Sequence, residues 1–428
     1  MRRVLKLIAV LAAVVLLSGC AMATVEDLYC LPKRSEEYEN LQVVIDKAMT
    51  GLTYSAPVYG ENRHFLQAAD LDGDGIEEYL LFAKDDSERP LKILIFCQLA
   101  SGYVLMDTIE GYGFVFDFVR FAQMDDHPGL ELVVGRQLSD QVMGNVSIYR
   151  FISGFSRQLM STSYSDLTIT DLDNDGISEL FLLTPGMSEK SYGTARLFRY
   201  EDGELQRSAE IQVSAPISGF KMMESGRLQD GRPVVFVTSA SDNSTLVTDI
   251  FGLDEGTLTS IMKGITVESI QNFFVYPSDM DDDGVLELPT LVPIPEREGF
   301  SRQEYLIEWY SLSSDGTRNF KECTYHNFTD NWLYRLEKGC AEHLSVKHID
   351  NSTMFYWDGE LVLTIVALTD ADREEQAKQP GWSILYSSES VIYVAFIEEN
   401  TSELDLFIKE EIMARFSPIR VDLNSEKD

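Results

Sequence analysis

Three short segments of the sequence carry acidic residues and a glycine in the same order. They are DLDGDGIEEYLLF from Asp70, DLDNDGISELFLL from Asp171 and DMDDDGVLELPTL from Asp279, and each reads D-x-D-x-D-G-x-x-E. Carboxylates at positions 1, 3 and 5 can face one side of a tight turn, and the glycine at position 6 permits the bend. The acid at position 9 and the backbone carbonyl of position 7 complete a shell of oxygen ligands. Such flexibly arranged oxygen ligands suit Ca²⁺ better than the rigid octahedron of Mg²⁺.

The sequence therefore predicts three structural Ca²⁺ sites, one in each loop. The expected ligands are Asp70, Asp72, Asp74, Ile76 and Glu78; Asp171, Asp173, Asp175, Ile177 and Glu179; and Asp279, Asp281, Asp283, Val285 and Glu287. Ile76, Ile177 and Val285 would contribute their backbone carbonyls. Every carboxylate is engaged in this interpretation, so no catalytic role is assigned to these residues.

Two other interpretations of the loops are weaker. An EF-hand needs a bidentate acid at position 12 and a helix after the loop, but position 12 is Leu81, Leu182 or Thr290, and no helical pattern follows. A single acidic turn can also be solvated without a metal. Three matched copies make that explanation the weaker one here.

Two degenerate copies extend the series. In FAQMDDHPGLELVVG, Gln123 falls at position 1 and Glu131 at position 9, and Gln123, His127 and Pro128 replace ligands, so we expect this site to be empty. A fainter copy begins at Ser225 (SGRLQDGRPVVFV). The first positions are then 70, 123, 171, 225 and 279, at spacings of 53, 48, 54 and 54 residues.

The sequence between the loops is typical of β-strands. EYLLFAK, LKILIFCQL, GYVLMDTI and FDFVRFAQ follow the first loop, each bounded by turn-forming residues. Four strands in about 50 residues match one blade of a β-propeller. One blade cannot bury both of its faces alone, so successive blades should stack around an axis. We predict a mainly β protein with a propeller over residues 61–312; a β-solenoid is the alternative, although its rungs are shorter.

The first twenty residues indicate export and lipidation. A basic start is followed by an apolar run over residues 7–17, which is shorter than the ~20 residues of a membrane-spanning helix. The tetrapeptide Leu17-Ser18-Gly19-Cys20 resembles the lipobox of bacterial lipoproteins. By that resemblance residues 1–19 are a signal peptide, Cys20 carries the lipid, and the protein is anchored to the outer face of the bacterial cell membrane. Residues 20–60 form the lipidated N-terminal segment, with a short helix in SEEYENLQVVIDKAM, whose apolar face is expected to carry Leu41, Val44, Ile45 and Ala48.

The loop and strand pattern resembles the FG-GAP or VCBS repeat of integrin-type β-propellers. The mature chain also resembles uncharacterised VCBS-repeat lipoproteins of the Clostridia, through YSAPVYGENRHFLQAADLDGDGIEEYLL, LELVVG and TDNWLYRL. This resemblance implies a calcium-stabilised propeller on a lipid anchor, and that family has no established activity to carry over. The chain departs from the pattern in its eroded second loop and in Asp282, which stands at position 4 where glycine or asparagine is usual.

Beyond residue 312 the loop pattern stops. Strand-like VKHID, TMFYWD, LVLTIVALT, WSILYSS and VIYVAFI alternate with helical DADREEQAKQ and SELDLFIKEEIMARF. Residues 313–428 are therefore predicted to form a small α+β domain. Export permits a disulfide, and Cys323 with Cys340 could form one, whereas Cys97 lies in an apolar strand and is expected to be a buried thiol.

Composition and motifs limit the function. The net charge is −35, from 35 basic and 70 acidic residues, which disfavours a nucleic-acid partner. There is no P-loop, Rossmann glycine pattern or G-x-S-x-G. We favour a binding or scaffolding module for a protein or glycan; the alternative is a calcium-dependent extracellular enzyme acting on polysaccharide or lipid. Buried acids with raised pKa beside a deep pocket would favour the enzyme.

Overall fold

The computed structural model describes residues 36–138, 143–184, 191–216, 219–241, 244–270, 273–300, 302–398, 407 and 409–419. The predicted signal peptide and Cys20 lie outside the described residues. Within them the protein is mainly β, and none of the described helices is long and apolar enough to cross a membrane.

Six antiparallel sheets follow one another along the chain. The first contains β1 (Thr53–Tyr54), β2 (Leu66–Ala69), β3 (Glu78–Lys84), β4 (Leu91–Leu99) and β5 (Gly102–Gly111). The second contains β6 (Val115–Ala122), β7 (Glu131–Gln137), β8 (Gly144–Ile152) and β9 (Phe155–Tyr164). The third contains β10 (Asp166–Thr170), β11 (Glu179–Thr184), β12 (Tyr192–Glu201) and β13 (Glu204–Pro216). The fourth contains β14 (Phe220–Arg227), β15 (Pro233–Ala240), β16 (Thr245–Asp254) and β17 (Thr257–Glu268).

The last two sheets have five strands each. The fifth contains β18 (Leu288–Pro293), β19 (Tyr305–Leu312), β20 (Arg318–Asn327), β21 (Trp332–Leu336) and β27 (Phe416–Pro418). The sixth contains β22 (Leu344–Ile349), β23 (Ser352–Trp357), β24 (Glu360–Leu368), β25 (Ser383–Ser387) and β26 (Ile392–Ile397). A short 3-10 helix, η2 (Cys340–Glu342), joins the two sheets.

The sheets repeat one plan, which fits the spacing found in the sequence. In the second, third and fourth sheets the strands pair in chain order, whereas in the first sheet β1 and β2 both pair with β3, which is followed by β4 and β5. The first four loops join β2 to β3, β6 to β7, β10 to β11 and β14 to β15, and the fifth loop directly precedes β18. The first five sheets also share a β-bulge between the second and third strands that follow each loop, at Ile95/Phe96, Ile148/Tyr149, Leu197/Phe198, Ile250/Phe251 and Trp309/Tyr310. A bulge at the same place in each copy supports a structural repeat, because bulges are built features of a fold.

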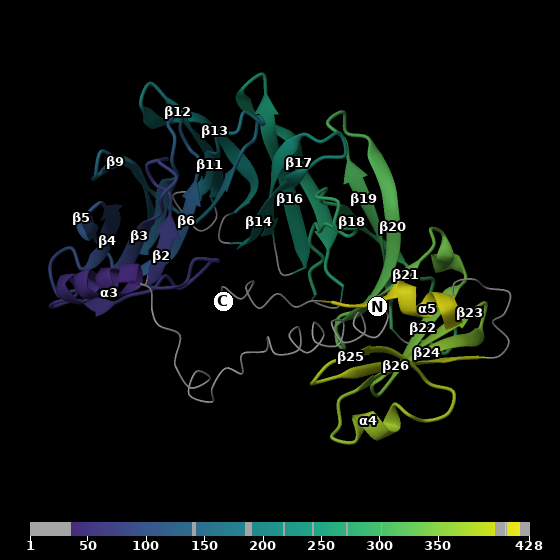
Figure 1. The fold of residues 1–428 in the computed structure, drawn as a ribbon. Coiled ribbons are helices and arrows are strands. Elements are labelled where there is room, and N and C mark those ends of the chain that lie inside the picture. Colours follow the sequence, from purple (N-terminus) through teal and green to yellow (C-terminus); the bar gives the residue numbers. More distant parts are fainter. Residues whose placement is uncertain are drawn as a thin grey trace, which may run out of the picture.

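Successive sheets pack face to face and follow a curve (Figure 1). Separate hydrophobic clusters join the first sheet to the second, the second to the third, and so on to the sixth. This arrangement of four-stranded antiparallel sheets is propeller-like. Among the described residues, no hydrophobic cluster contains residues of both the first and the sixth sheet, so the curve is not closed by the packing seen between neighbours.

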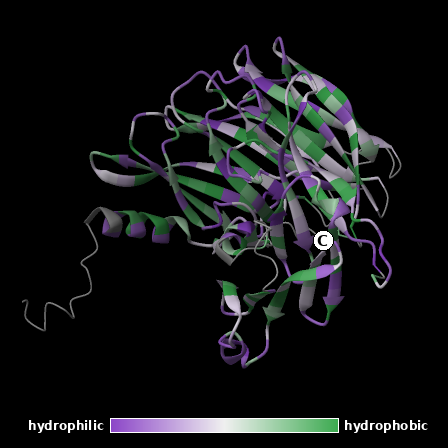
Figure 2. Ribbon diagram, turned by 90° about the vertical axis from the view of Figure 1, so that its right-hand side faces the viewer, coloured by the Kyte–Doolittle hydropathy of each residue, from purple (hydrophilic) through white to green (hydrophobic). Residues whose placement is uncertain are grey.

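Both end sheets are instead covered by other segments. Alternate residues of a strand face opposite sides of a sheet, so in β3 Leu80 and Phe82 face the second sheet while Leu81 and Ala83 face helix α3 (Glu36–Ala48). At the other end, Val366 and Leu368 of β24 pack against the segment that follows α4 (Arg373–Gln376), through Ala377 and Trp382. Green apolar residues run through the sheets in Figure 2. An open stack needs such caps because its end sheets would otherwise expose an apolar face.

Helix α3 matches the helix predicted in residues 35–49. Its residues Leu41 and Ile45 are buried against the first sheet, and Val44 and Ala48 pack beside them. The predicted apolar face of this helix is therefore the face that the structure buries.

The C-terminal part differs from the prediction in its connections. The five predicted strands of residues 346–397 are present in the sixth sheet, but the fifth sheet contains strands on both sides of residue 312, where the loop pattern ends. Helix α5 (Lys409–Arg415) and β27 return to the fifth sheet, with Ile412 and Phe416 in the cluster between the last two sheets. A separate domain over residues 313–428 stays a prediction.

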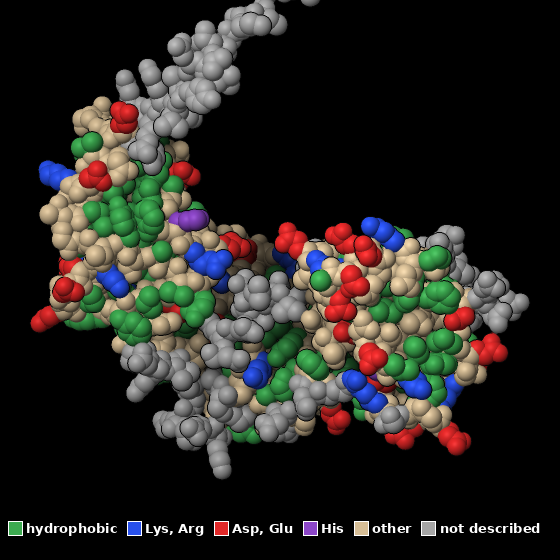
Figure 3. Space-filling model, turned by 90° about the horizontal axis from the view of Figure 1, so that it is seen from below, with side chains coloured by type: hydrophobic (Ala, Val, Ile, Leu, Met, Phe, Trp, Pro, Cys, Tyr) green, Lys and Arg blue, Asp and Glu red, His purple; other side chains and the backbone are tan. Residues whose placement is uncertain are grey.

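The described cysteines are buried free thiols. Cys323 and Cys340 lie in one hydrophobic cluster without a disulfide between them, and Cys97 is buried as predicted. Burial raises the pKa of Cys97 and of Cys323 to about 12. Both thiols are therefore protonated at neutral pH and unreactive. At the surface, acidic side chains are spread widely with fewer basic ones among them (Figure 3), as the net charge requires.

Candidate metal centres

The three predicted calcium loops each bring three carboxylates together. One oxygen of each of Asp70, Asp72 and Glu78 lies within 4.8 Å of the others, and the same holds for Asp171, Asp173 and Glu179 and for Asp279, Asp281 and Glu287. These are positions 1, 3 and 9 of the loop. In each case the residue at position 9 is buried and the residue at position 3 is exposed.

Backbone amides fix the carboxylate at position 1. In the first loop Asp70 accepts hydrogen bonds from the amides of Gly73 (2.7 Å) and Gly75 (3.0 Å). In the third loop Asp171 accepts from Asp175 (3.2 Å) and Gly176 (2.9 Å). The fifth loop repeats this pattern at Asp279, with the amides of Asp283 and Gly284 as donors.

The glutamate at position 9 is held in the same way in four loops. One carboxylate oxygen accepts a hydrogen bond from the amide at position 2, and the residues paired are Leu71 with Glu78, Met124 with Glu131, Leu172 with Glu179, and Met280 with Glu287, at 2.7–3.0 Å. The second carboxylate oxygen remains for another ligand. In the fifth loop that oxygen, Oε1 of Glu287, is buried and accepts no hydrogen bond from the described residues.

At two positions of each loop the backbone has a positive φ, a left-handed conformation that favours glycine. At position 6, φ is +86° at Gly75, +89° at Gly176 and +81° at Gly284, and nothing lies within 4 Å of a Cβ built there, so conformation rather than space selects glycine. Position 4 is also left-handed, with Asn174 and Asp282 both at φ 59°. Asp282 is exposed, as expected for a side chain that points away from the site.

The remaining predicted ligands lie in the same turns but outside these clusters. Asp74, Asp175 and Asp283 at position 5 do not belong to the groups within 4.8 Å. Their carboxylates instead accept hydrogen bonds of 2.8 Å from the amides of Ile76, Ile177 and Val285 at position 7. A cation bound at positions 1, 3 and 9 would therefore need a small rearrangement to recruit position 5.

Burial makes the position-9 carboxylates hard to ionise without a cation. The pKa of Glu78, Glu179 and Glu287 is raised from 4.5 to about 7, mainly by desolvation, with the neighbouring aspartates adding to the rise and the hydrogen bond from the position-2 amide opposing it. A bound divalent cation would reverse this effect, because an opposite charge favours the ionised carboxylate.

The second loop holds a side-chain cation. Arg150 on β8 forms an ion pair with Asp125, and its Nε lies 3.8 Å from Oε1 of Glu131. All three side chains are at most 8% exposed. The guanidinium also lies over the ring of Tyr200 on the next sheet, 5.0 Å from its centroid.

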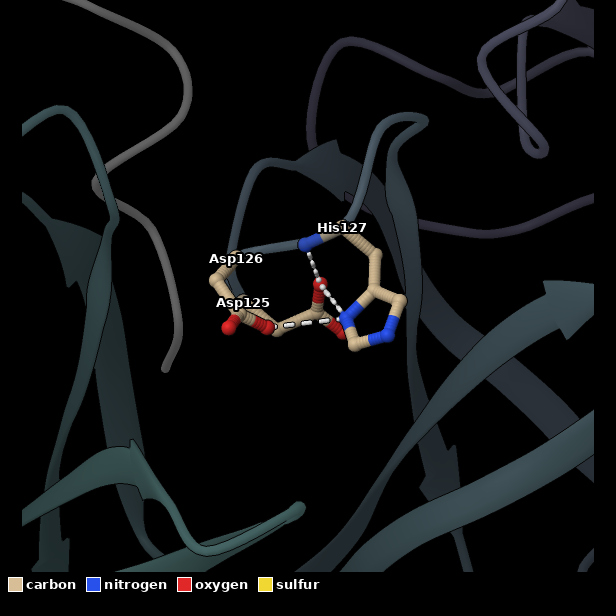
Figure 4. Close-up of side chains that lie close together, drawn as sticks. All are labelled: Asp125, Asp126 and His127. Carbon is tan, nitrogen blue, oxygen red and sulfur yellow. Dashed lines mark hydrogen bonds and ion pairs between the residues drawn. The ribbon is translucent and has the colours of Figure 1, made fainter.

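The second loop also brings Asp125, Asp126 and His127 close together (Figure 4). The His127 amide donates to Asp125 (2.7 Å), and its ring nitrogen Nδ1 lies 2.8 Å from Asp126. The side chain of Gln123, at position 1, donates to the carbonyls of Asp125 and His127. Because Arg150 already pairs with Asp125, a cation that entered this loop would have to compete with the guanidinium.

Basic side chains also reach two of the three intact loops. Arg199 on β12 forms an ion pair with Asp173, and its Nε lies 3.3 Å from Glu179. In the fifth loop, Nζ of Lys321 on β20 lies 3.2 Å from Asp281, 2.7 Å from Asp283 and 3.8 Å from Glu287. Among the described residues, no Lys, Arg or His forms an ion pair with the carboxylates of the first loop.

These basic residues were not found from the sequence alone. Arg150 directly follows the bulge pair Ile148/Tyr149 in the second sheet, and Arg199 directly follows Leu197/Phe198 in the third. In the first sheet Cys97 occupies the same position, after Ile95/Phe96. An alignment of the third strands, IFCQL, IYRFI and LFRYE, would have shown a basic residue at one position. The sequence reasoning aligned the loops and not the strands.

The loops of neighbouring sheets are joined through their backbones. The amide of Leu130 in the second loop donates to the carbonyl of Asp70 (3.0 Å), and the amide of Ser178 in the third loop donates to the carbonyl of Gln123 (2.7 Å). Both bonds connect position 8 of one loop with position 1 of the loop before it. The first three loops therefore form a connected row, so ordering one loop supports the next.

A small pocket lies between the fifth and sixth sheets. It is lined by Ile294, Pro295, Glu296, Phe300, Arg302, Glu304, Ser345 and Val346. Glu304 is buried there and accepts a hydrogen bond from Tyr325 (3.1 Å), and His348 Nε2 lies 3.3 Å from it. The cavity volume is about 10 Å³, roughly room for one water molecule. This pocket is too small for a polysaccharide or lipid substrate.

The concentrated aromatic residues of the C-terminal half pack inside the protein. Trp309, Trp332 and Tyr334 are at most 2% exposed. The indole nitrogen of Trp309 donates to Thr324 (2.8 Å), so its polar group is satisfied internally. These three residues do not line a ligand groove.

Comparison with known proteins gives no family for this chain. No family model and no curated protein matches it. Solved structures with some likeness include a Lactobacillus plantarum protein (TM-score 0.31, 11% identity, 72% of this chain and 84% of that one). Others are an exotype rhamnogalacturonan lyase (TM-score 0.33, 12% identity, 67% of this chain and 64% of that one) and a candidate 6-phosphogluconolactonase from Bacteroides uniformis (TM-score 0.32, 12% identity, 72% of this chain and 85% of that one). The description of the fold rests on the sheets themselves.

Proposed function

We propose that this protein is a calcium-stabilised, propeller-like binding or scaffolding module of FG-GAP or VCBS type. The observation that carries the proposal is the triple recurrence of one carboxylate cluster. Positions 1, 3 and 9 converge in three loops, and in each the position-1 carboxylate accepts a hydrogen bond from the amide of the position-6 glycine. The donor set is made of hard oxygens, which Ca²⁺ prefers, and the unpartnered Oε1 of Glu287 fits a cation ligand.

The calcium is proposed to stabilise the fold rather than to take part in a reaction. Each loop directly precedes a central strand of its sheet, and the first three loops are joined by backbone hydrogen bonds, so an ion there would hold the loop and the start of that strand in place. The ligand of the module would be a protein or a glycan.

Removing calcium is expected to lower the melting temperature. A ligand that binds only the folded state stabilises it by mass action, by about 1.4 kcal/mol per site at a ten-fold excess over Kd. Extracellular calcium sites often have Kd of about 10⁻⁴–10⁻³ M, so millimolar calcium should give a clear effect. Thermal unfolding of the full chain would be followed by circular dichroism with calcium and after chelation.

Two variants test whether the loops cause that change. Asp171→Ala removes a position-1 ligand of one of the three sites, so part of the calcium-dependent rise should be lost. Gln123→Ala removes two hydrogen bonds from a loop without a calcium shell, so the rise should stay intact although basal stability falls by about 1 kcal/mol. Equal melting temperatures with and without calcium, or equal losses in both variants, would contradict the proposal.

We also propose that the protein is exported and tethered to the outer face of the cell membrane through a lipid on Cys20. The support is the signal-like sequence and the lipobox resemblance. Cys20→Ser should shift the protein from the membrane fraction to the soluble fraction in cell fractionation, because the thiol that would carry the lipid is gone. Unchanged membrane association of this variant would disprove lipid anchoring at Cys20.

A further inference from the structure

One position of the repeat differs in charge between sheets that otherwise share their geometry. On the third strand, the β-bulge falls at Ile95/Phe96, Ile148/Tyr149 and Leu197/Phe198 in the first three sheets. The next residue is Cys97, Arg150 or Arg199, respectively. We call this the post-bulge position. Its side chain lies beside the carboxylates of the loop in the same sheet.

In the second sheet the post-bulge residue serves as a built-in cation. Arg150 contacts Asp125 and Glu131, is itself 6% exposed, and is held from the other side by the ring of Tyr200. The loop has lost its calcium ligands at positions 1 and 5 and has gained a guanidinium. The two changes compensate, because buried carboxylates need a counter-charge.

In the third sheet the post-bulge arginine is less firmly held. The Arg199 side chain is 22% exposed, its partner Asp173 is 27% exposed, and the loop keeps every calcium ligand. The guanidinium also donates a hydrogen bond to the carbonyl of Gly256 (3.2 Å), which lies outside the loop. A cation entering this loop would therefore compete with a partly solvated side chain.

The fifth sheet reaches a similar state by another route. Its post-bulge residue is Ser311, and Lys321, the extra residue of the bulge on β20, contacts the loop instead. The Lys321 side chain is 21% exposed, and it leaves the buried Oε1 of Glu287 without a hydrogen bond.

The first sheet has no such cation. Cys97 occupies the post-bulge position as a buried thiol, which is uncharged at neutral pH. The carboxylates of Asp70, Asp72 and Glu78 therefore depend on an external ion for their counter-charge.

We infer that the basic side chains rank the loops by their calcium affinity. The first loop binds calcium first and most tightly, the third and fifth loops bind it only by displacing Arg199 and Lys321, and the second loop is permanently neutralised by Arg150. This inference rests on the proposed calcium role and adds the order in which the sites fill.

The test is a calcium titration of the full chain by isothermal titration calorimetry. The wild-type protein should show one tight step followed by two steps about ten-fold weaker, the factor that an ion pair of about 1.4 kcal/mol would give. Asp70→Asn should remove the tight step. Arg199→Gln should convert one weak step into a step about as tight as the first.

Matched variants separate charge from general damage. Arg199→Lys keeps the internal cation, so the weak step should stay weak. Arg196 lies on the same strand, pairs with Glu210 and is 29% exposed, so Arg196→Gln should change nothing. Cys97→Arg places an arginine beside the first loop and should abolish the tight step; Arg199→Gln still decides the question if that variant does not fold.

Some results would overturn the inference while leaving the calcium role intact. These are three ions bound with one affinity, a tight step that survives Asp70→Asn, or an Arg199→Gln variant with wild-type affinities. Absence of any calcium binding to the wild-type protein would overturn both the proposed function and the inference.

Discussion

Replacing Arg150 with methionine is expected to lower the free energy of unfolding by about 3–5 kcal/mol, whether or not calcium is present. Among the described residues, Arg150 is the only Lys or Arg that forms an ion pair with Asp125 and Glu131. These two carboxylates are 0% and 2% exposed. Methionine keeps most of the volume and the contact with Tyr200 but leaves two buried carboxylates without a counter-charge. Calcium cannot compensate, because the second loop has glutamine at position 1. Chemical denaturation of the full chain would measure the change.

Two comparisons make the Arg150 prediction specific. Arg157 pairs with Arg150 across strands β8 and β9 but is exposed, so Arg157→Met should change stability by less than about 0.5 kcal/mol. The triple variant Arg150→Met, Asp125→Asn, Glu131→Gln should recover much of the loss, since buried amides cost less than buried charges. The idea of an internal cation would be wrong if Arg150→Met were as mild as Arg157→Met, or if the neutral triple variant were no more stable than the single one.

The effect of Arg150→Met should also depend on pH. Burial raises the pKa of Glu131 to about 8, with Asp125 adding to the rise and Arg150 opposing it. Without Arg150 the glutamate should hold its proton more strongly. The loss of stability should therefore be larger at pH 8, where the folded wild-type protein begins to ionise Glu131 and the variant does not, than at pH 5, where both folded proteins hold the proton.

The sequence predicts the repeated parts of this structure well because their causes are local. Strands β3 and β4 coincide with EYLLFAK and LKILIFCQL, since their runs of aliphatic and aromatic residues and the flanking turn residues are visible in the sequence. The acidic loops were found for the same reason. Aspartates, a left-handed glycine and a buried glutamate must stand at fixed spacing to form the turn, as at Asp70, Gly75 and Glu78.

The parts that the sequence did not predict depend on contacts between distant segments. Arg150 and Lys321 reach their loops from 19 or more residues away, across a sheet, so no local motif marks them. Helix α3 was predicted with its apolar face, but only the packing on Leu81 and Leu94 shows that it covers the end of an open stack. Strand β19 also pairs with β20 across residue 312. The sequence did not predict this pairing, because the loop pattern ends before it and marks no strand partners.

The second large effect expected is a reversal of the pH dependence of stability by calcium. In the metal-free protein, stability should fall as the pH rises from about 5 to about 8. The pKa of Glu78, Glu179 and Glu287 is about 7 in the fold against an ordinary value of 4.5. Between these values the folded protein holds protons that the unfolded chain has released, so raising the pH favours unfolding. Each carboxyl contributes at most about 3 kcal/mol, because one pKa unit corresponds to about 1.4 kcal/mol.

Calcium should remove this decline, since a cation at positions 1, 3 and 9 stabilises the ionised glutamate and must displace its proton to bind. The rise in melting temperature caused by calcium should therefore be small at pH 5 and large at pH 8, as scanning calorimetry of metal-stripped and calcium-saturated protein would show.

Glu78→Gln removes one titrating group and one ligand, so it should flatten the metal-free decline by about a third and reduce the calcium effect at pH 8. A calcium effect of equal size at pH 5 and pH 8 would mean that the buried glutamates are not ligands, and the carboxylate clusters would then be acidic turns that do not hold a metal.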